Sequence, residues 1–184
     1  IEGYVEIHGY SHINNLNGLN VLTAIGQYLK IQSGYALYSL SGLDNLSSVG
    51  GDVIIHHNYI SNISSLGNLT SIGGTLEISN NAGLTSLTGM DGLTFIGGSL
   101  NISNNDGLIS LSALDGITSI GGRLNICANN QLNSLTGLEG ITSIGGNLQI
   151  VWNSDLTSLT GLDNVTSIGG DLRINDNHEL ISLS

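Results

Sequence analysis

The stretch IGGSLNISNN, residues 96–105, decides the fold, because versions of it fill the chain from end to end. The phrase Ile-Gly-Gly-x-Leu-x-Ile begins at Ile72, Ile96, Ile120, Ile144 and Ile168, and looser versions begin at Ile25 and Val49. The spacing is 24 residues throughout, apart from 23 residues between Val49 and Ile72. A fixed period in the twenties is typical of a solenoid, in which each turn buries an apolar face against its neighbours.

Each repeat contains two kinds of apolar spacing. Leu76-Glu77-Ile78 alternates apolar and polar residues, which predicts a short strand. After a polar bend, apolar residues recur at every third position, a spacing that suits extended or 3₁₀-like segments. Gly97-Gly98 then turns the chain into the next strand. We therefore predict an all-β repeat solenoid of the right-handed β-helix or leucine-rich-repeat type, with about eight 24-residue turns and one short parallel sheet. Residues 1–184 are expected to form a single domain.

An asparagine follows the strand isoleucine by three residues in most repeats. Such a residue at a bend can satisfy buried backbone groups of its own turn and of the adjacent turn. Because it recurs in turn after turn, we interpret the column as structural. Its members are Asn58, Asn81, Asn105, Asn129, Asn153 and Asn177.

Composition excludes several classes of function. Fourteen acidic residues against three basic ones give a net charge of −11, so the chain lacks the clustered cations that bind nucleic acid or an anionic membrane. No apolar run approaches the ~20 residues that a membrane-spanning helix needs. The single Cys127 excludes an intramolecular disulfide and a cysteine-ligated zinc site.

Both ends of the chain lie within the repeating pattern. This predicts a mature or excised piece of a longer protein, or a unit whose ends are covered by something else, since solenoids usually carry polar caps. An uncapped turn exposes unpaired strand groups and apolar columns, which favours self-association through the solenoid ends.

The repeats resemble known ones. Leu-x-Ile-x-x-Asn-x-x-Leu, as in Leu100 to Leu108, is similar to the core of leucine-rich repeats. The added Ile-Gly-Gly and the Leu-x-x-Leu ladder resemble receptor L-domain repeats, the ligand-binding ectodomain modules of insulin- and EGF-receptor-type proteins. Related repeats occur in microbial cell-surface proteins. The resemblance implies a binding or adhesive role outside the cell, and the single cysteine and uniform repeats favour a surface or secreted repeat protein over a hormone receptor.

The first sixty residues repeat least faithfully, and they hold all six tyrosines and four of the five histidines. Exposed aromatic side chains in a chain with few of them are typical of a recognition surface. Register would place Tyr4 beside Tyr28, with Tyr35 and Tyr59 neighbours at the following bend. The candidate binding residues are therefore Tyr4, His8, Tyr28, Lys30, Tyr35, His56 and Tyr59, with Trp152 as a separate candidate. The alternative is that the early turns have merely diverged from the repeat sequence and have no binding role.

Two other columns carry polar groups. Asp44, Asp91, Asp115, Glu139 and Asp163 form an acidic column, interpreted as a solvated face in preference to a Ca²⁺ site. Threonine and serine columns precede the buried isoleucine, and hydrogen bonding up the stack is favoured over ice or polysaccharide binding.

We therefore predict an extracellular or cell-surface binding or adhesion module with a protein or glycan ligand and no catalytic residue, cofactor or metal. The alternatives are an ice- or polysaccharide-surface-binding protein, a β-helical polysaccharide lyase or hydrolase, and a self-assembling structural repeat.

Overall fold

The fold is almost entirely β-structure. The computed structural model describes residues 1–8 and 12–183. Within these residues the helices are three short 3₁₀ segments, η1 (Asn17–Leu19), η2 (Ser64–Leu66) and η3 (Ser112–Leu114). No helix of the described part is long and apolar enough to cross a membrane.

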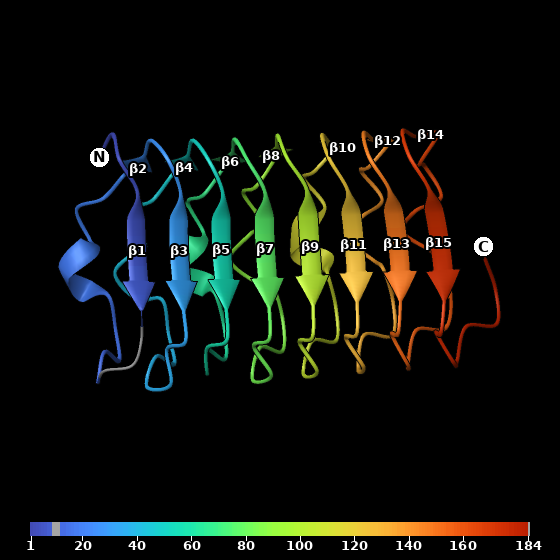
Figure 1. Ribbon diagram of the computed structural model, residues 1–184, viewed down its shortest axis with the longest axis horizontal. Coiled ribbons are helices and arrows are strands. Elements are labelled where there is room, and N and C mark those ends of the chain that lie inside the picture. The colour runs from blue at the N-terminus through green and yellow to red at the C-terminus, as the bar shows by residue number, and fades with distance from the viewer. Residues whose placement is uncertain (9–11, 184) are drawn as a thin grey trace.

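Eight four-residue strands form one parallel sheet in chain order, as Figure 1 shows. Each strand pairs in register with the strand of the neighbouring turn, so that Leu124 lies over Leu100 and Ile126 over Ile102. The predicted solenoid is confirmed. The strands of this sheet are β1 (Val5–His8), β3 (Leu29–Gln32), β5 (Val53–His56), β7 (Leu76–Ser79), β9 (Leu100–Ser103), β11 (Leu124–Cys127), β13 (Leu148–Val151) and β15 (Leu172–Asn175).

A second parallel sheet adds to the single sheet predicted from the sequence. Its strands are only two residues long and come directly before the Gly-Gly turn, so they are too short to show an alternating pattern. Backbone bonds extend the pairing into the glycines, as in Gly97 N donating to Ile72 O at 2.9 Å. The strands are β2 (Ala24–Ile25), β4 (Ser48–Val49), β6 (Ser71–Ile72), β8 (Phe95–Ile96), β10 (Ser119–Ile120), β12 (Ser143–Ile144) and β14 (Ser167–Ile168).

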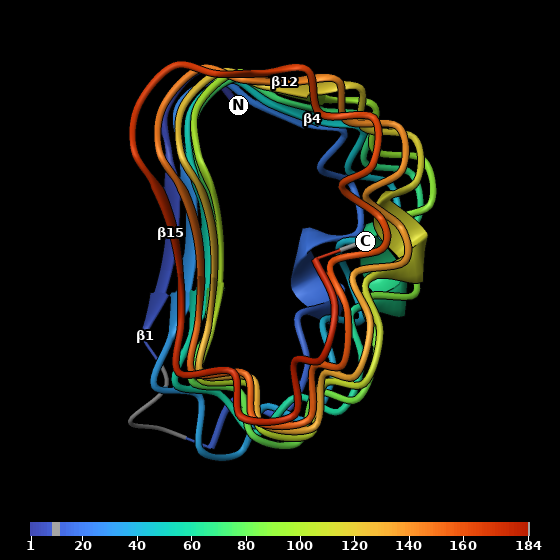
Figure 2. The same ribbon diagram turned by 90° about the vertical axis from the view of Figure 1, so that its right-hand side faces the viewer.

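The core runs as a continuous aliphatic column inside the coil. Viewed along the stack, the eight-stranded sheet forms one wall, the seven-stranded sheet lies across one end, and the irregular segment forms the opposite wall (Figure 2). Every third residue of that segment points inward, which explains its apolar period. In one turn the fully buried residues are Leu100, Ile102, Leu108, Leu111, Leu114, Ile117 and Ile120.

The irregular wall is built in two ways. Some turns carry a 3₁₀ segment, and others carry a glycine with φ between 108° and 113°, at Gly42, Gly89, Gly137 and Gly161. In these glycine turns the acidic residue two positions later accepts a hydrogen bond from the glycine N–H, as Glu139 does from Gly137 at 2.7 Å. The acidic column thus caps turns as well as facing solvent.

Candidate binding surface

The asparagine column lies inside the scaffold. Its six side chains are buried, and each links adjacent turns. Asn105 Oδ1 accepts the backbone N–H of Asn81 at 3.1 Å, while Asn105 Nδ2 donates to Ile78 O at 2.9 Å. These amides are occupied by backbone groups, so they are unavailable to a ligand.

The hydroxyl column is also engaged within the stack. Thr70 Oγ1 donates to Ser47 O at 3.1 Å, and Thr94 Oγ1 donates to Thr70 O at 3.3 Å. The same contact recurs from Thr166 to Thr142. Hydroxyl hydrogens that are already donated cannot also order a water lattice or a polysaccharide, which favours the structural interpretation.

Most carboxylates of the acidic column contact the backbone, and the column does not form a metal-binding group within the described residues. In four turns its carboxylates make the same contact with a glycine N–H, at Asp44, Asp91, Glu139 and Asp163. The Gly42 N–H is the main reason why the pKa of Asp44 is lowered. Among the described residues no group of three or more His, Cys, Asp or Glu side chains could hold a metal ion.

The outer face of β1 and β3 carries a tyrosine pair at its upper end. The rings of Tyr4 and Tyr28 stack with centroids 4.7 Å apart and planes 4° apart. Tyr4 is 55% exposed, and Tyr28 is half-buried. Two parallel rings on a strand face offer a rigid apolar area at low entropic cost to a partner.

Glu6 gathers three hydrogen-bond donors next to this pair. Its carboxylate contacts Lys30 Nζ at 3.3 Å and His8 Nε2 at 2.9 Å, and it accepts from the Tyr28 hydroxyl at 3.4 Å. The bonds from Lys30 and then His8 lower the pKa of Glu6. Burial raises the pKa of Tyr28, and the negative charge of Glu6 raises it further. Glu6 therefore holds charge and Tyr28 stays a neutral donor at neutral pH.

A directed chain of hydrogen bonds continues across the strand ends. His56 Nε2 donates to Gln32 Oε1 at 2.7 Å, and Gln32 Nε2 donates to the ring of His8. His57 Nδ1 lies 3.1 Å from His56 Nδ1. Since His56 already donates through Nε2, its Nδ1 accepts, and this pattern assigns the hydrogen to His57 Nδ1. The hydrogen-bond chain thus runs from His57 to Glu6.

His56 is a partly buried member of this chain. Burial lowers the pKa of His56 below its ordinary value of 6.5, and the neighbouring His57 lowers it further. This direction agrees with the assigned hydrogen bonds, in which an uncharged His56 accepts at Nδ1 from His57. The network therefore favours the uncharged form.

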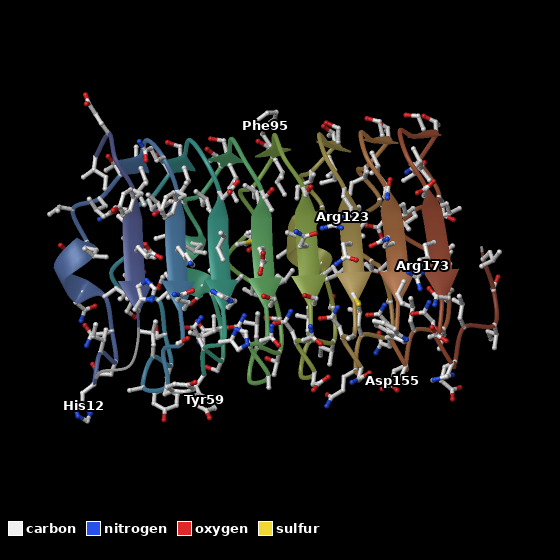
Figure 3. The ribbon with its side chains drawn as sticks, viewed as in Figure 1. His12, Tyr59, Phe95, Arg123, Asp155 and Arg173 are labelled. Atoms are coloured by element: carbon white, nitrogen blue, oxygen red, sulfur yellow. The ribbon has the colours of Figure 1, made fainter. Side chains whose placement is uncertain are left out.

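The chain of imidazoles leads to the bend below the sheet, where Tyr59 is labelled in Figure 3. Tyr35 and Tyr59 lie with ring centroids 5.9 Å apart, and both rings are more than half exposed. The structure therefore gathers seven of the sequence-predicted residues on the first three turns. Tyr10 lies outside the described residues. We call the set Tyr4, Glu6, His8, Tyr28, Lys30, Gln32 and His56 the N-terminal face.

Trp152 does not join this set. It is exposed, with φ 59°, directly after β13. It occupies the same column as His57 but lies four turns away, roughly 19 Å at about 4.8 Å per turn. It is therefore a separate aromatic feature.

Several exposed apolar or aromatic residues were not singled out from the sequence, among them Tyr38, Ile109 and Phe95. Tyr38 and Ile109 share a column of the irregular segment. Phe95, labelled in Figure 3, stands on the second sheet in place of the serine of neighbouring turns. Phe95 also lines a shallow hollow together with Ile1 and three glycines that follow the second-sheet strands, Gly26, Gly50 and Gly73. A break in the serine column was the signal that could have identified Phe95.

Comparison with known proteins supports the architecture. Residues 1–73 match the family model of the receptor L domain. No curated protein matches the chain, and no solved structure matches it either. The matched residues include the whole N-terminal face.

Proposed function

We propose that this receptor L-domain-like solenoid is a non-catalytic binding module that recognises a protein ligand outside the cell or at the cell surface. The receptor L domain is a ligand-binding, non-catalytic family whose ligands are generally proteins and whose members are typically extracellular. The match over residues 1–73 supports the binding role.

One observation carries the proposal. Inward columns repeat almost unchanged along the stack, whereas the outward residues of β1, β3 and β5 break the pattern with acidic, basic and imidazole groups, and Tyr4 and Tyr28 add aromatic groups directly before β1 and β3. These groups are fixed by ring stacking and by the hydrogen-bond chain before any ligand arrives. A preorganised surface of this kind loses little side-chain entropy on binding.

The acidic column gives a reason to favour binding over hydrolysis. General acid and base roles need two carboxyl groups whose environments separate their pKa values. In the glycine turns the carboxylates of the column share one environment, a contact with the glycine N–H. A catalytic pair has no support in this arrangement.

The ends of the solenoid support a second proposal, self-association with another copy. Within residues 1–8 and 12–183, β15 pairs with β13 alone and β1 with β3 alone, so each has one open edge. Leu172 on β15 is 57% exposed. If a second copy continued the stack in register, Leu172 would meet Val5 and Arg173 would meet Glu6, an apolar pair and an opposite-charge pair.

The binding proposal can be tested on an array of secreted proteins and ectodomains. We expect wild-type chain to bind one or more of them, and the double variant Tyr4→Ala/Tyr28→Ala to lose that binding by roughly tenfold or more, as for loss of anchor residues. Asn125→Ala/Gln149→Ala, on later turns of the same sheet face, is the matched control and should bind normally. Equal loss in both variants, or no binding at all, would refute the proposal.

A further inference from the structure

We propose that the pocket between Tyr35 and Tyr59 binds one unit of a neutral saccharide. The pocket lies at the bend that follows β3, β5 and β7 and has a volume of about 150 Å³. It is lined by Tyr35, His57, Asn58, Tyr59, Asn80 and Ala82. It is distinct from the N-terminal face, which lies on the strands.

The two tyrosines form open aromatic walls. Their ring planes are inclined at 52° with centroids 5.9 Å apart, and each residue is 56% exposed. The faces of aromatic rings carry negative potential. The C–H groups on one face of a pyranose ring carry partial positive charge, so a sugar ring can pack against a tyrosine face while its hydroxyls point outward.

The backbone places two polar groups beside these walls. His57 and Asn80 both have φ 56°, a left-handed conformation that turns the side chain out of the strand pattern. His57 Nδ1 contacts His56 Nδ1 at 3.1 Å, so Nε2 is the ring nitrogen left to bond a sugar hydroxyl. The backbone N–H of Asn80 donates to Ser103 O at 3.0 Å, whereas its side-chain amide makes no hydrogen bond to the described residues and offers both a donor and an acceptor. Alternating donors and acceptors of this kind suit sugar hydroxyls.

The charge and the volume of the pocket restrict the class of ligand that it can bind. No Lys, Arg, Asp or Glu lines the pocket, so a charged ligand would lose hydration without gaining a counter-charge. Pockets for drug-sized ligands measure about 300–1,000 Å³. A pocket of about 150 Å³ therefore suits a single small ring. The next turn places Ala82 where Tyr59 stands, which ends the aromatic wall.

The test is an NMR titration of the whole chain with methyl glycosides of glucose, galactose, mannose and N-acetylglucosamine. Glucuronic acid and glucosamine serve as charged counterparts. We expect at least one neutral glycoside, at millimolar concentration, to shift the Tyr59 ring and Asn80 side-chain amide signals. Tyr59→Ala should weaken this binding by roughly tenfold.

A matched pair of variants isolates the contribution of the Asn80 side-chain amide. Asn80 and Asn104 occupy equivalent positions with φ 56° and 55°, so glycine at either keeps the backbone conformation. Asn80→Gly should weaken binding, and Asn104→Gly should not. Tyr4→Ala/Tyr28→Ala should bind the glycoside normally, so failure of the N-terminal face proposal would not mimic failure here.

Four results would overturn the inference. They are no shift with any neutral glycoside, tighter binding of a charged counterpart, shifts confined to the threonine column, and full affinity in Tyr59→Ala. Peptide ligands shifting the same signals while every glycoside fails would also overturn it.

Discussion

At the scale of the residue, the polar side chains fall into two groups according to their hydrogen-bond partners. The buried Asn column bonds to backbone of adjacent turns, while His8, Gln32 and His56 bond to one another on the surface. The recurrence of the asparagines predicted their place in the stack. The imidazole chain could not be predicted, because it depends on ring orientations and on the left-handed backbone at His57.

Asn105→Ala should destabilise the fold strongly. The substitution leaves the N–H of Asn81 and the carbonyl of Ile78 without their partner. Each buried unsatisfied group costs about 1–3 kcal/mol. Urea unfolding measures the loss, and Asn130→Ala, at an exposed position, serves as the control with an expected change of about 0.5 kcal/mol or less. A loss no larger than that of the control would contradict the ladder's role.

Stability should decline as pH falls below 6.5, and His56 should account for part of the decline. The lowered pKa of His56 in the folded chain means that the unfolded chain takes up its proton first. The contribution of His56 is therefore complete above pH 6.5 and is lost as pH falls toward its folded pKa. Glu6 and Asp44, with pKa values lowered from 4.5 and 3.8, act only at lower pH.

Urea unfolding at a series of pH values between 7.5 and 5 measures this effect. His56→Gln should show a shallower decline than wild type. Identical slopes in the two proteins would show that His56 does not couple folding to protons.

At the scale of the element, the two constructions of the irregular wall differ in what they tolerate. A glycine turn brings the chain against the preceding turn, and a Cβ at Gly137 would lie 2.1 Å from Leu111 O. Gly18 lies in the 3₁₀ segment of the first turn, where an added Cβ would meet nothing within 4 Å. Period and composition predicted the strands, but neither distinguishes these two constructions.

Gly137→Ala should therefore destabilise the chain, and Gly18→Ala should not. Left-handed backbone costs an L-residue about 1–2 kcal/mol, and the clash with Leu111 adds to it. At Gly18 the substitution should change stability by about 1 kcal/mol or less, since it mainly restricts the unfolded chain. Thermal unfolding of both variants measures the difference, and equal midpoints would contradict this account of the turn.

At the scale of the whole molecule, the regular spacing of apolar residues predicted most of the architecture. It predicted the stacked turns, the parallel strands and the inward columns, because burial fixes them all. The second sheet escaped prediction because Ser119–Ile120 and its counterparts are two residues long. Register predicted that Tyr4 lies beside Tyr28, but the parallel stacking of their rings and the hydrogen bonds of Gln32 with two histidines are properties of the folded surface.

Head-to-tail association should appear as concentration-dependent sedimentation. Leu172→Lys places a charge on the open edge of β15 and should shift the chain toward monomer. Ile109→Lys changes an exposed apolar residue in the middle of the stack and is the matched control. A wild-type chain that stays monomeric at every concentration would exclude this association.

The most direct test of the binding account is hydroxyl-radical footprinting of the chain with and without a partner from the ectodomain array. Aromatic side chains report on separate regions of the surface, with Tyr4 and Tyr28 on the N-terminal face, Phe95 on the second sheet and Trp152 near the far end. The account predicts that the partner protects Tyr4 and Tyr28 from oxidation and leaves Phe95 and Trp152 unchanged. Protection of Phe95 or Trp152 with Tyr4 still fully reactive would contradict it.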